Sequence, residues 1–156
     1  MSPHDNPLTL DQFFNPRAVA VVGASADPAK LGYAVLNNVI EHGFTGAVYP
    51  INPKADEILG LPAYPSLLAI PGLLDLAVVV VPPKAVAGVL EEAGQKGAKG
   101  AIVITAGFRE VGPQGMAMEK ELLAIARKHG MRLIGPNCLG IIDTYAPLQA
   151  SFALGM

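Results

Sequence analysis

The sequence predicts an α/β fold built on a doubly wound parallel sheet with helices on both faces. Short runs of β-branched residues alternate with longer segments whose apolar residues recur at helical spacing. The short runs are continuously apolar, as expected for strands that are covered on both faces. We therefore expect five strands, at residues 18–22, 46–51, 76–81, 100–105 and 131–135.

Three helices are expected between these strands, at residues 31–42, 83–97 and 114–129, because each segment gathers its apolar side chains on one face. Residues 56–72 lack such a pattern and are expected to form an irregular connection with a short helix. Right-handed crossovers then give a parallel sheet, for which we predict the strand order 3-2-1-4-5.

Length and composition fit a single domain. The 156 residues carry a net charge of −2, and 51% of them are apolar, which argues against disorder and against a broad electrostatic contact with nucleic acid. We expect a tail at residues 1–10 and one domain at residues 11–156. The N-terminus lacks the pattern of a signal peptide, no apolar run is long enough for a membrane helix, and there is one cysteine, so a cytoplasmic location with no membrane partner is expected.

Ligands of such sheets bind outside the carboxyl ends of the strands, near the point where the strand order reverses. Five loops follow the expected strands and form the candidate site, at residues 23–32, 52–54, 82–84, 105–109 and 136–140.

The first loop has features of a diphosphate site. Gly23 permits a tight turn after the strand, Ser25 offers a hydroxyl, and Lys30 offers a positive charge beside the free amides of the next helix. The dinucleotide fingerprint requires glycine at positions 25 and 28, where this sequence has Ser25 and Pro28. The match therefore fails beyond its first glycine.

The second loop, PINPK, has no carboxylate before Lys54 that would hold the ribose hydroxyls of NAD. A lysine at this position favours a ligand with an additional phosphate near the ribose, as in coenzyme A (CoA) or NADP. The ordinary alternative is a solvated lysine in a turn. The loop thus leaves CoA and NADP open and disfavours NAD.

The remaining loops offer little reactive chemistry. Cys138 is a candidate nucleophile, but His4, His42 and His129 have no evident pairing with it, and free cysteine is usually a small buried apolar residue. The sequence contains no metal-ligand spacing, no GxSxG elbow and no P-loop motif. We assign no catalytic and no metal-binding residue, and we expect no chemistry by this chain alone.

Five ordered motifs carry a family resemblance: NPRAVAVVGAS, YPINPK, VVVPP, ITAGF and IGPNCLG. Together they resemble the Rossmann-like N-terminal CoA-binding domain of NDP-forming acyl-CoA synthetases. The chain is similar to the α subunit of the ADP-forming acetyl-CoA synthetases and, more distantly, to that of succinyl-CoA synthetase. The resemblance favours CoA over NADP as the ligand. The CoA-binding residues that it implies are Gly23, Ala24, Ser25, Lys30, Asn52, Pro53, Lys54, Val81, Pro82, Thr105, Ala106, Gly107, Phe108, Asn137 and Cys138.

Within that set, the resemblance puts Gly23, Ala24, Ser25 and Lys30 at the diphosphate and residues 52–54 at the adenosine and its 3′-phosphate. Residues 81–82 flank the nucleotide, residues 105–108 border the pantetheine, and residues 137–138 lie near the thiol.

The resemblance also implies partners. Family members transfer phosphate through a histidine in a following domain and bind nucleotide in an ATP-grasp portion, and no residue here matches that histidine. We therefore expect the first domain of a longer protein, which orients the CoA thiol for attack on an acyl phosphate and depends on the remaining domains or subunits for activity. The alternatives are a stand-alone CoA-binding regulatory protein, the CoA-binding domain of a protein acetyltransferase, and an NADP-binding fragment.

Overall fold

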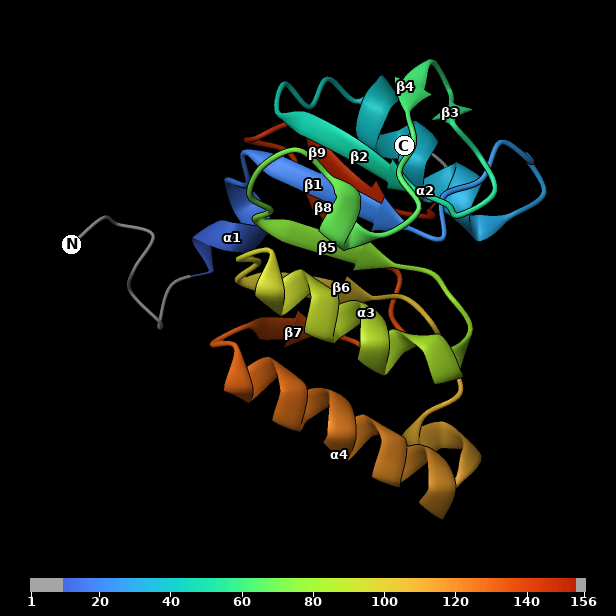
Figure 1. The fold of residues 1–156 in the computed structure, drawn as a ribbon, viewed down its shortest axis with the longest axis vertical. Coiled ribbons are helices and arrows are strands. Elements are labelled where there is room, and N and C mark those ends of the chain that lie inside the picture. The colour runs from blue at the N-terminus through green and yellow to red at the C-terminus, as the bar shows by residue number, and fades with distance from the viewer. Residues whose placement is uncertain (1–9, 154–156) are drawn as a thin grey trace.

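A parallel sheet of five strands forms the centre of the computed structural model, which describes residues 10–153 (Figure 1). The predicted α/β fold with five parallel strands is confirmed. Residues 1–9 of the predicted tail at residues 1–10 lie outside the described residues, and so do residues 154–156 of the predicted domain. The strands are β1 (Ala18–Val22), β2 (Ala47–Ile51), β5 (Leu76–Val79), β6 (Gly100–Val103) and β7 (Arg132–Ile134).

The order of the strands differs from the prediction. The sheet runs β2-β1-β5-β6-β7, which in chain order is 2-1-3-4-5, so the predicted order 3-2-1-4-5 is wrong. Pro50 explains the difference, because a proline lacks the N–H that a second neighbouring strand needs and is confined to edge strands. On the outer side of β2, the carbonyl of Pro50 accepts only the N–H of Tyr64, at 3.0 Å. The buried, fully apolar β5 takes the inner place beside β1 instead.

The predicted helices are present within two residues of their expected ends. They are α2 (Leu31–Glu41), α3 (Pro83–Gln95) and α4 (Pro113–Lys128), and the short helix expected within residues 56–72 is the 3-10 helix η2 (Leu67–Ala69). No described helix is both long and apolar enough to cross a membrane. The further elements are α1 (Asp11–Phe14), η3 (Arg109–Val111), the hairpin of β3 (Glu57–Ile58) with β4 (Leu61–Pro62), and the hairpin of β8 (Gly140–Asp143) with β9 (Leu148–Ser151).

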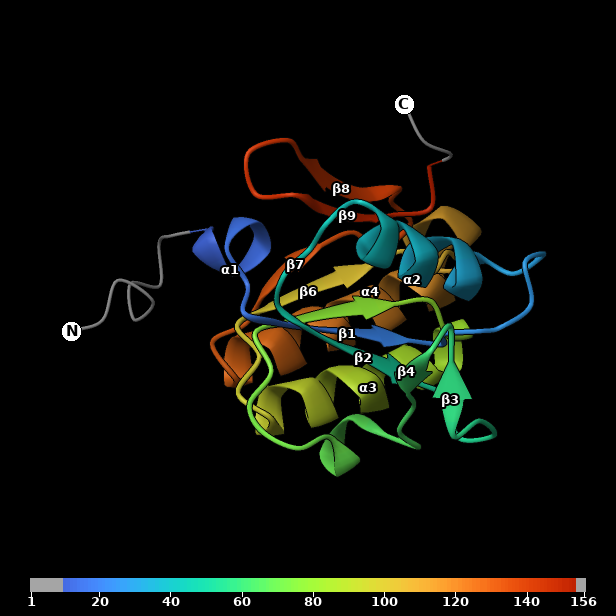
Figure 2. The same ribbon diagram turned by 90° about the horizontal axis from the view of Figure 1, so that it is seen from above.

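Each face of the sheet has its own cover (Figure 2). Helices α3 and α4 pack on one face, and α2 together with the β8–β9 hairpin packs on the other. The Nδ2 group of Asn38 in α2 donates to the carbonyls of Ser151 and Ala153, at 2.8 and 3.0 Å, and so joins helix and hairpin.

Asp75 aligns the amino ends of the neighbouring strands β1 and β5. Its Oδ2 atom accepts hydrogen bonds from the backbone N–H groups of Arg17 and Ala18, at 2.7 and 3.0 Å. These bonds fix the start of β1 against the residue that precedes β5. The carboxylate thus satisfies two strand-end donors that no other described residue satisfies.

An ion-pair cluster joins α3 to α4. The Oε1 atom of Glu91 lies 2.7 Å from Nζ of Lys128 and 3.0 Å from Nε2 of His129. The hydrogen bond from Lys128, followed by that from His129, holds the pKa of the Glu91 carboxyl below its usual value of 4.5. The His129 ring packs directly on Gly94, where a Cβ atom would overlap it. The cluster therefore holds the two helices on this face together.

Candidate functional site

A groove of about 410 Å³ opens at the carboxyl ends of β1 and β2 and extends to the loop after β5. It lies where β1 separates β2 from β5, the reversal of strand order at which open α/β sheets bind ligands. We call it the switch-point groove. Its lining residues are Val22, Gly23, Ala24, Ser25, Lys30, Ile51, Asn52, Pro53, Lys54, Pro65, Ser66, Val81, Val89 and Glu92.

Two glycines shape the turn that begins the groove. Gly23 has a φ of +93°, and a Cβ atom there would lie 2.7 Å from the carbonyl oxygen of Val80. Gly32 is buried at the start of α2, and a Cβ atom there would overlap the carbonyl oxygen of Gly23. The close packing of helix and strand that the dinucleotide fingerprint assigns to a glycine is therefore provided here by Gly32, which the sequence analysis did not single out.

Residues 25–30 form a loop stabilised by its own polar groups. The hydroxyl of Ser25 accepts the N–H of Asp27, and the carboxylate of Asp27 accepts the N–H of Ala29, each at 3.0 Å. Lys30 is exposed and directly precedes α2, whose first turn has no side-chain cap. The first amides of α2 and the Lys30 ammonium group thus offer an anion both N–H donors and a positive charge.

Asn52 joins the first two loops. Its Nδ2 group donates to the carbonyl of Ala24 at 2.9 Å, and its Oδ1 atom accepts the N–H of Lys54 at 2.8 Å. Both ends of the amide are therefore engaged in holding the loops, and the exposed side chains of Pro53 and Lys54 lie at the rim. No described residue forms an ion pair with Lys30 or Lys54.

The sequence analysis missed one wall of the groove, formed by Pro65, Ser66, Val89 and Glu92. The Oε2 atom of Glu92 accepts the N–H of Leu67 at 3.1 Å, which fixes the start of η2 against α3. Glu92 follows Val89 by three residues and so shares its side of the helix. One signal in the sequence could have indicated this wall: Glu92 is a carboxylate at the border of the apolar face of α3. The helix prediction treated that face only as part of the core.

The other predicted residues lie farther along the same sheet edge, outside the lining of the switch-point groove. Pro82 directly precedes α3, and Ala106 and Asn137 are exposed in the loops after β6 and β7. The hydroxyl of Thr105 donates to the carbonyl of Val81 at 2.7 Å, and the N–H of Asn137 donates to the carbonyl of Thr105 at 3.0 Å. Hydrogen bonds therefore link the loops after β5, β6 and β7 into one continuous edge.

The loop after β6 also contributes to the core. The side chain of Phe108 is fully buried and packs with the core between the sheet and helices α3 and α4. A contact of residue 108 with a ligand would therefore come from its backbone, and the place of this residue beside the pantetheine stays a prediction. Gly107 has a φ of +105°, and its N–H donates to the carboxylate of Glu110 at 2.5 Å. A glycine is required there because the loop turns sharply before η3.

Cys138 is half-buried beside β6. Its Sγ atom donates a hydrogen bond to the carbonyl of Val103 at 3.4 Å. Burial raises the pKa of this thiol above its ordinary value of 9.0, so the group is a neutral thiol near pH 7. This favours the interpretation of Cys138 as a packing residue over that of a nucleophile.

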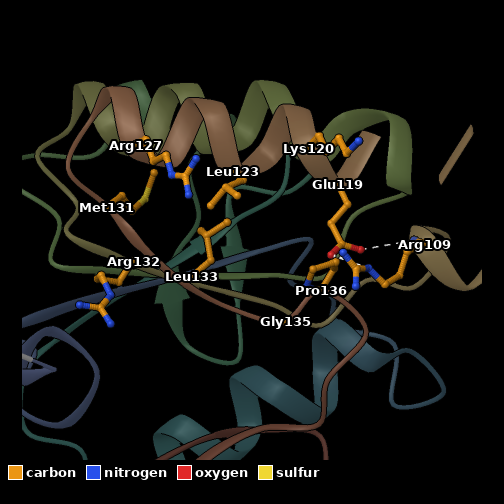
Figure 3. Close-up of a pocket in the computed structure, with 10 residues that line it drawn as sticks. All are labelled: Arg109, Glu119, Lys120, Leu123, Arg127, Met131, Arg132, Leu133, Gly135 and Pro136. Atoms are coloured by element: carbon orange, nitrogen blue, oxygen red, sulfur yellow. Dashed lines mark hydrogen bonds and ion pairs between the residues drawn. The ribbon is translucent and has the colours of Figure 1, made fainter. Parts of the chain in front are cut away.

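A second cavity, of about 400 Å³, lies between α4 and β7 at the outer edge of the sheet (Figure 3). We call it the outer-edge cavity. Arg109 and Glu119 form an ion pair across its rim, with Nε and Oε1 3.0 Å apart, and Leu123 and Leu133 face each other inside it. Its lining contains none of the fifteen residues that the family resemblance implies, although Arg109 and Pro136 belong to two of the candidate loops. No group of three or more potential metal ligands occurs within the described part of the chain.

The sheet topology and the switch-point groove are typical of α/β domains that bind nucleotides, and the uncapped start of α2 beside Lys30 is the kind of position at which such domains bind phosphate. Comparison with known families narrows this class, because residues 17–144 match the CoA-binding domain family. The match covers most of the chain, which therefore belongs to that family and is a CoA-binding domain.

Relatives agree with this assignment. The chain is 55% identical over 143 residues to the α subunit of acetate–CoA ligase (ADP-forming) II of Pyrococcus furiosus, covering 92% of this chain and 31% of that subunit. It therefore spans about a third of the length of that relative.

Two solved structures resemble the fold. A dinucleotide-forming acetyl-coenzyme A synthetase of Ca. Korarchaeum cryptofilum matches with 47% identity and a TM-score of 0.90, over 94% of this chain and 31% of that one. A hypothetical protein of Pyrococcus horikoshii matches with 30% identity and a TM-score of 0.68, over 82% of each chain.

Proposed function

We propose that the chain is the CoA-binding domain of an ADP-forming acyl-CoA ligase and that it holds the coenzyme in the switch-point groove. The observation that carries the proposal is the pairing of an uncapped helix start and Lys30 on one side of the groove with Lys54 on its rim. CoA carries two phosphorylated regions, the diphosphate and the 3′-phosphate. The two lysines offer a separate positive charge to each.

The role of the domain in the ligase is to present the thiol. With the nucleotide in the switch-point groove, the pantetheine follows the sheet edge past Thr105 and Ala106 toward Asn137. The CoA thiolate then attacks the carbonyl carbon of an acyl phosphate held by another domain, a C–S bond forms, and the C–O bond breaks as inorganic phosphate leaves. The proton of the thiol passes to solvent before the attack. The domain contributes proximity and orientation to this step.

A second candidate function is a stand-alone CoA-binding protein. It is favoured by the Pyrococcus horikoshii structure, because the alignment covers 82% of both chains and so shows this fold in a protein of similar length. Both candidates predict binding of CoA to this domain. They differ in whether the reading frame continues past Met156 into further ligase domains, which the gene sequence decides.

Isothermal titration with CoA, dephospho-CoA and NADP tests the proposal. We expect CoA to bind more tightly than dephospho-CoA, and Lys54→Met to weaken CoA binding by about tenfold while leaving dephospho-CoA unchanged. Lys99→Met is the matched control, because Lys99 is exposed at the opposite end of the sheet, before β6. Binding of NADP alone would refute the proposal, and equal effects of the two substitutions would refute the role of Lys54.

A further inference from the structure

The wall of the switch-point groove that α3 contributes differs in charge from the opposite wall. Lys30 and Lys54 are cationic, whereas Glu92 is the one acidic residue of the lining. A carboxylate repels phosphates and lysines attract them. In bound CoA the phosphates therefore lie toward the two lysines, and an uncharged part of the coenzyme lies toward Glu92. The inference that follows rests on the proposed function.

Apolar side chains share the lining of the groove with Glu92. Val81, Val89 and Pro65 belong to the same lining and offer flat or branched apolar contacts. The purine base is the one part of the nucleotide that combines an apolar face with hydrogen-bonding edges. The neighbourhood of Glu92 therefore fits the base.

The two oxygens of the Glu92 carboxylate differ in their hydrogen bonding. Oε2 accepts the N–H of Leu67 at 3.1 Å, and Oε1 accepts no hydrogen bond from any described residue. Because the side chain is held by Leu67 and lines the groove, Oε1 remains available to a ligand. An ionised carboxylate only accepts hydrogen bonds, so its partner must be a donor.

We propose that Glu92 selects adenine as the base of the bound coenzyme by accepting a hydrogen bond from the 6-amino group. A base with an oxygen at position 6, such as hypoxanthine or guanine, presents an acceptor there and is rejected by the carboxylate. Glu92 is thus a specificity-determining residue, and its bond to Leu67 fixes the orientation on which the discrimination depends.

The substitution Glu92→Gln tests the proposal because it replaces one hydrogen-bond acceptor of the side chain, a carboxylate oxygen, with a donor, the amide nitrogen. The amide oxygen of glutamine can still accept the N–H of Leu67, which turns the amide nitrogen toward the base. That nitrogen is a donor and pairs with an oxygen at position 6 better than with an amino group. The matched control is Glu91→Gln, because Glu91 is the adjacent carboxylate of α3 and pairs with Lys128 and His129 instead.

The experiment is calorimetric titration of each protein with CoA and with the CoA analogue whose adenine is replaced by hypoxanthine. We expect the wild type and Glu91→Gln to prefer CoA by roughly tenfold, the effect of one hydrogen bond to a charged group. We expect the preference to vanish or invert in Glu92→Gln. Each variant is judged by a ratio of two affinities, so partial loss of folded protein does not change the result.

The outcomes separate this inference from the proposed function. A wild type that binds CoA and the analogue equally, or a Glu92→Gln variant that keeps the full preference for CoA, overturns the selection of adenine and leaves CoA binding standing. A wild type that binds neither coenzyme overturns the proposed function and this inference with it.

Discussion

Gly32→Ala tests the packing that shapes the switch-point groove. In an exposed helix, replacing glycine by alanine stabilises a protein by about 0.5–1 kcal/mol. At Gly32 the added methyl group overlaps the carbonyl oxygen of Gly23, which is backbone and has no flexible end to move aside. Overpacking of this kind costs about 1–3 kcal/mol. We therefore expect a net loss of stability and a displaced turn that binds CoA several-fold more weakly.

The matched control is Gly88→Ala in α3, where an added Cβ atom meets nothing within 4 Å. Here we expect the ordinary gain of about 0.5–1 kcal/mol, with CoA affinity unchanged. Urea denaturation measures both stabilities, and calorimetric titration measures both affinities. Two variants of equal stability, or a Gly32→Ala variant with unchanged affinity for CoA, would refute the role given to Gly32.

Three further predictions concern groups outside the groove. Asp75→Ala removes the acceptor of two strand-end N–H groups that water can partly reach, so it should lower the unfolding free energy in urea by about 0.5–1.5 kcal/mol. The exposed Asp56→Ala should change the unfolding free energy by less than about 0.5 kcal/mol. Because the pKa of Glu91 is lowered in the folded protein, the stability that its ionised carboxylate contributes is present above pH 4.5 and is lost as the pH falls below that value. The difference in Tm between the wild type and Glu91→Gln should therefore shrink as the pH falls below 4.5, and a constant difference would contradict this. Because burial raises the pKa of the Cys138 thiol, iodoacetamide should alkylate it more slowly than free cysteine near neutral pH, and equal rates would contradict this.

Most of the sheet and its helices could be predicted because their signals are local. Continuous apolar runs and helical periodicity lie within single segments, and they located five strands and three helices. The strand order was wrong although its signal was present, since Pro50 restricts β2 to an edge. The β8–β9 hairpin had no such signal. Gln149 and Ser151 are buried in β9, and hydrogen bonds to Ala153 and Leu139 satisfy them.

Some residues of the candidate site could likewise be predicted from local signals, and others could not. The turn at Gly23 and the loop at Lys54 follow their strands directly, so topology alone brought them together. Glu92 could not be found in this way, because its place in the groove depends on a hydrogen bond to Leu67, 25 residues earlier in the chain. The burial of Phe108 could not be predicted from topology either, since its loop lies at the sheet edge while its side chain turns into the core.

Hydrogen–deuterium exchange with and without CoA locates the ligand on the chain, and it therefore tests whether CoA binds in the switch-point groove. We predict that CoA slows exchange in residues 22–34, 51–54 and 65–67, which contribute most of the lining of the switch-point groove and the start of α2. Protection confined to residues 119–136, which contribute most of the lining of the outer-edge cavity, would contradict it.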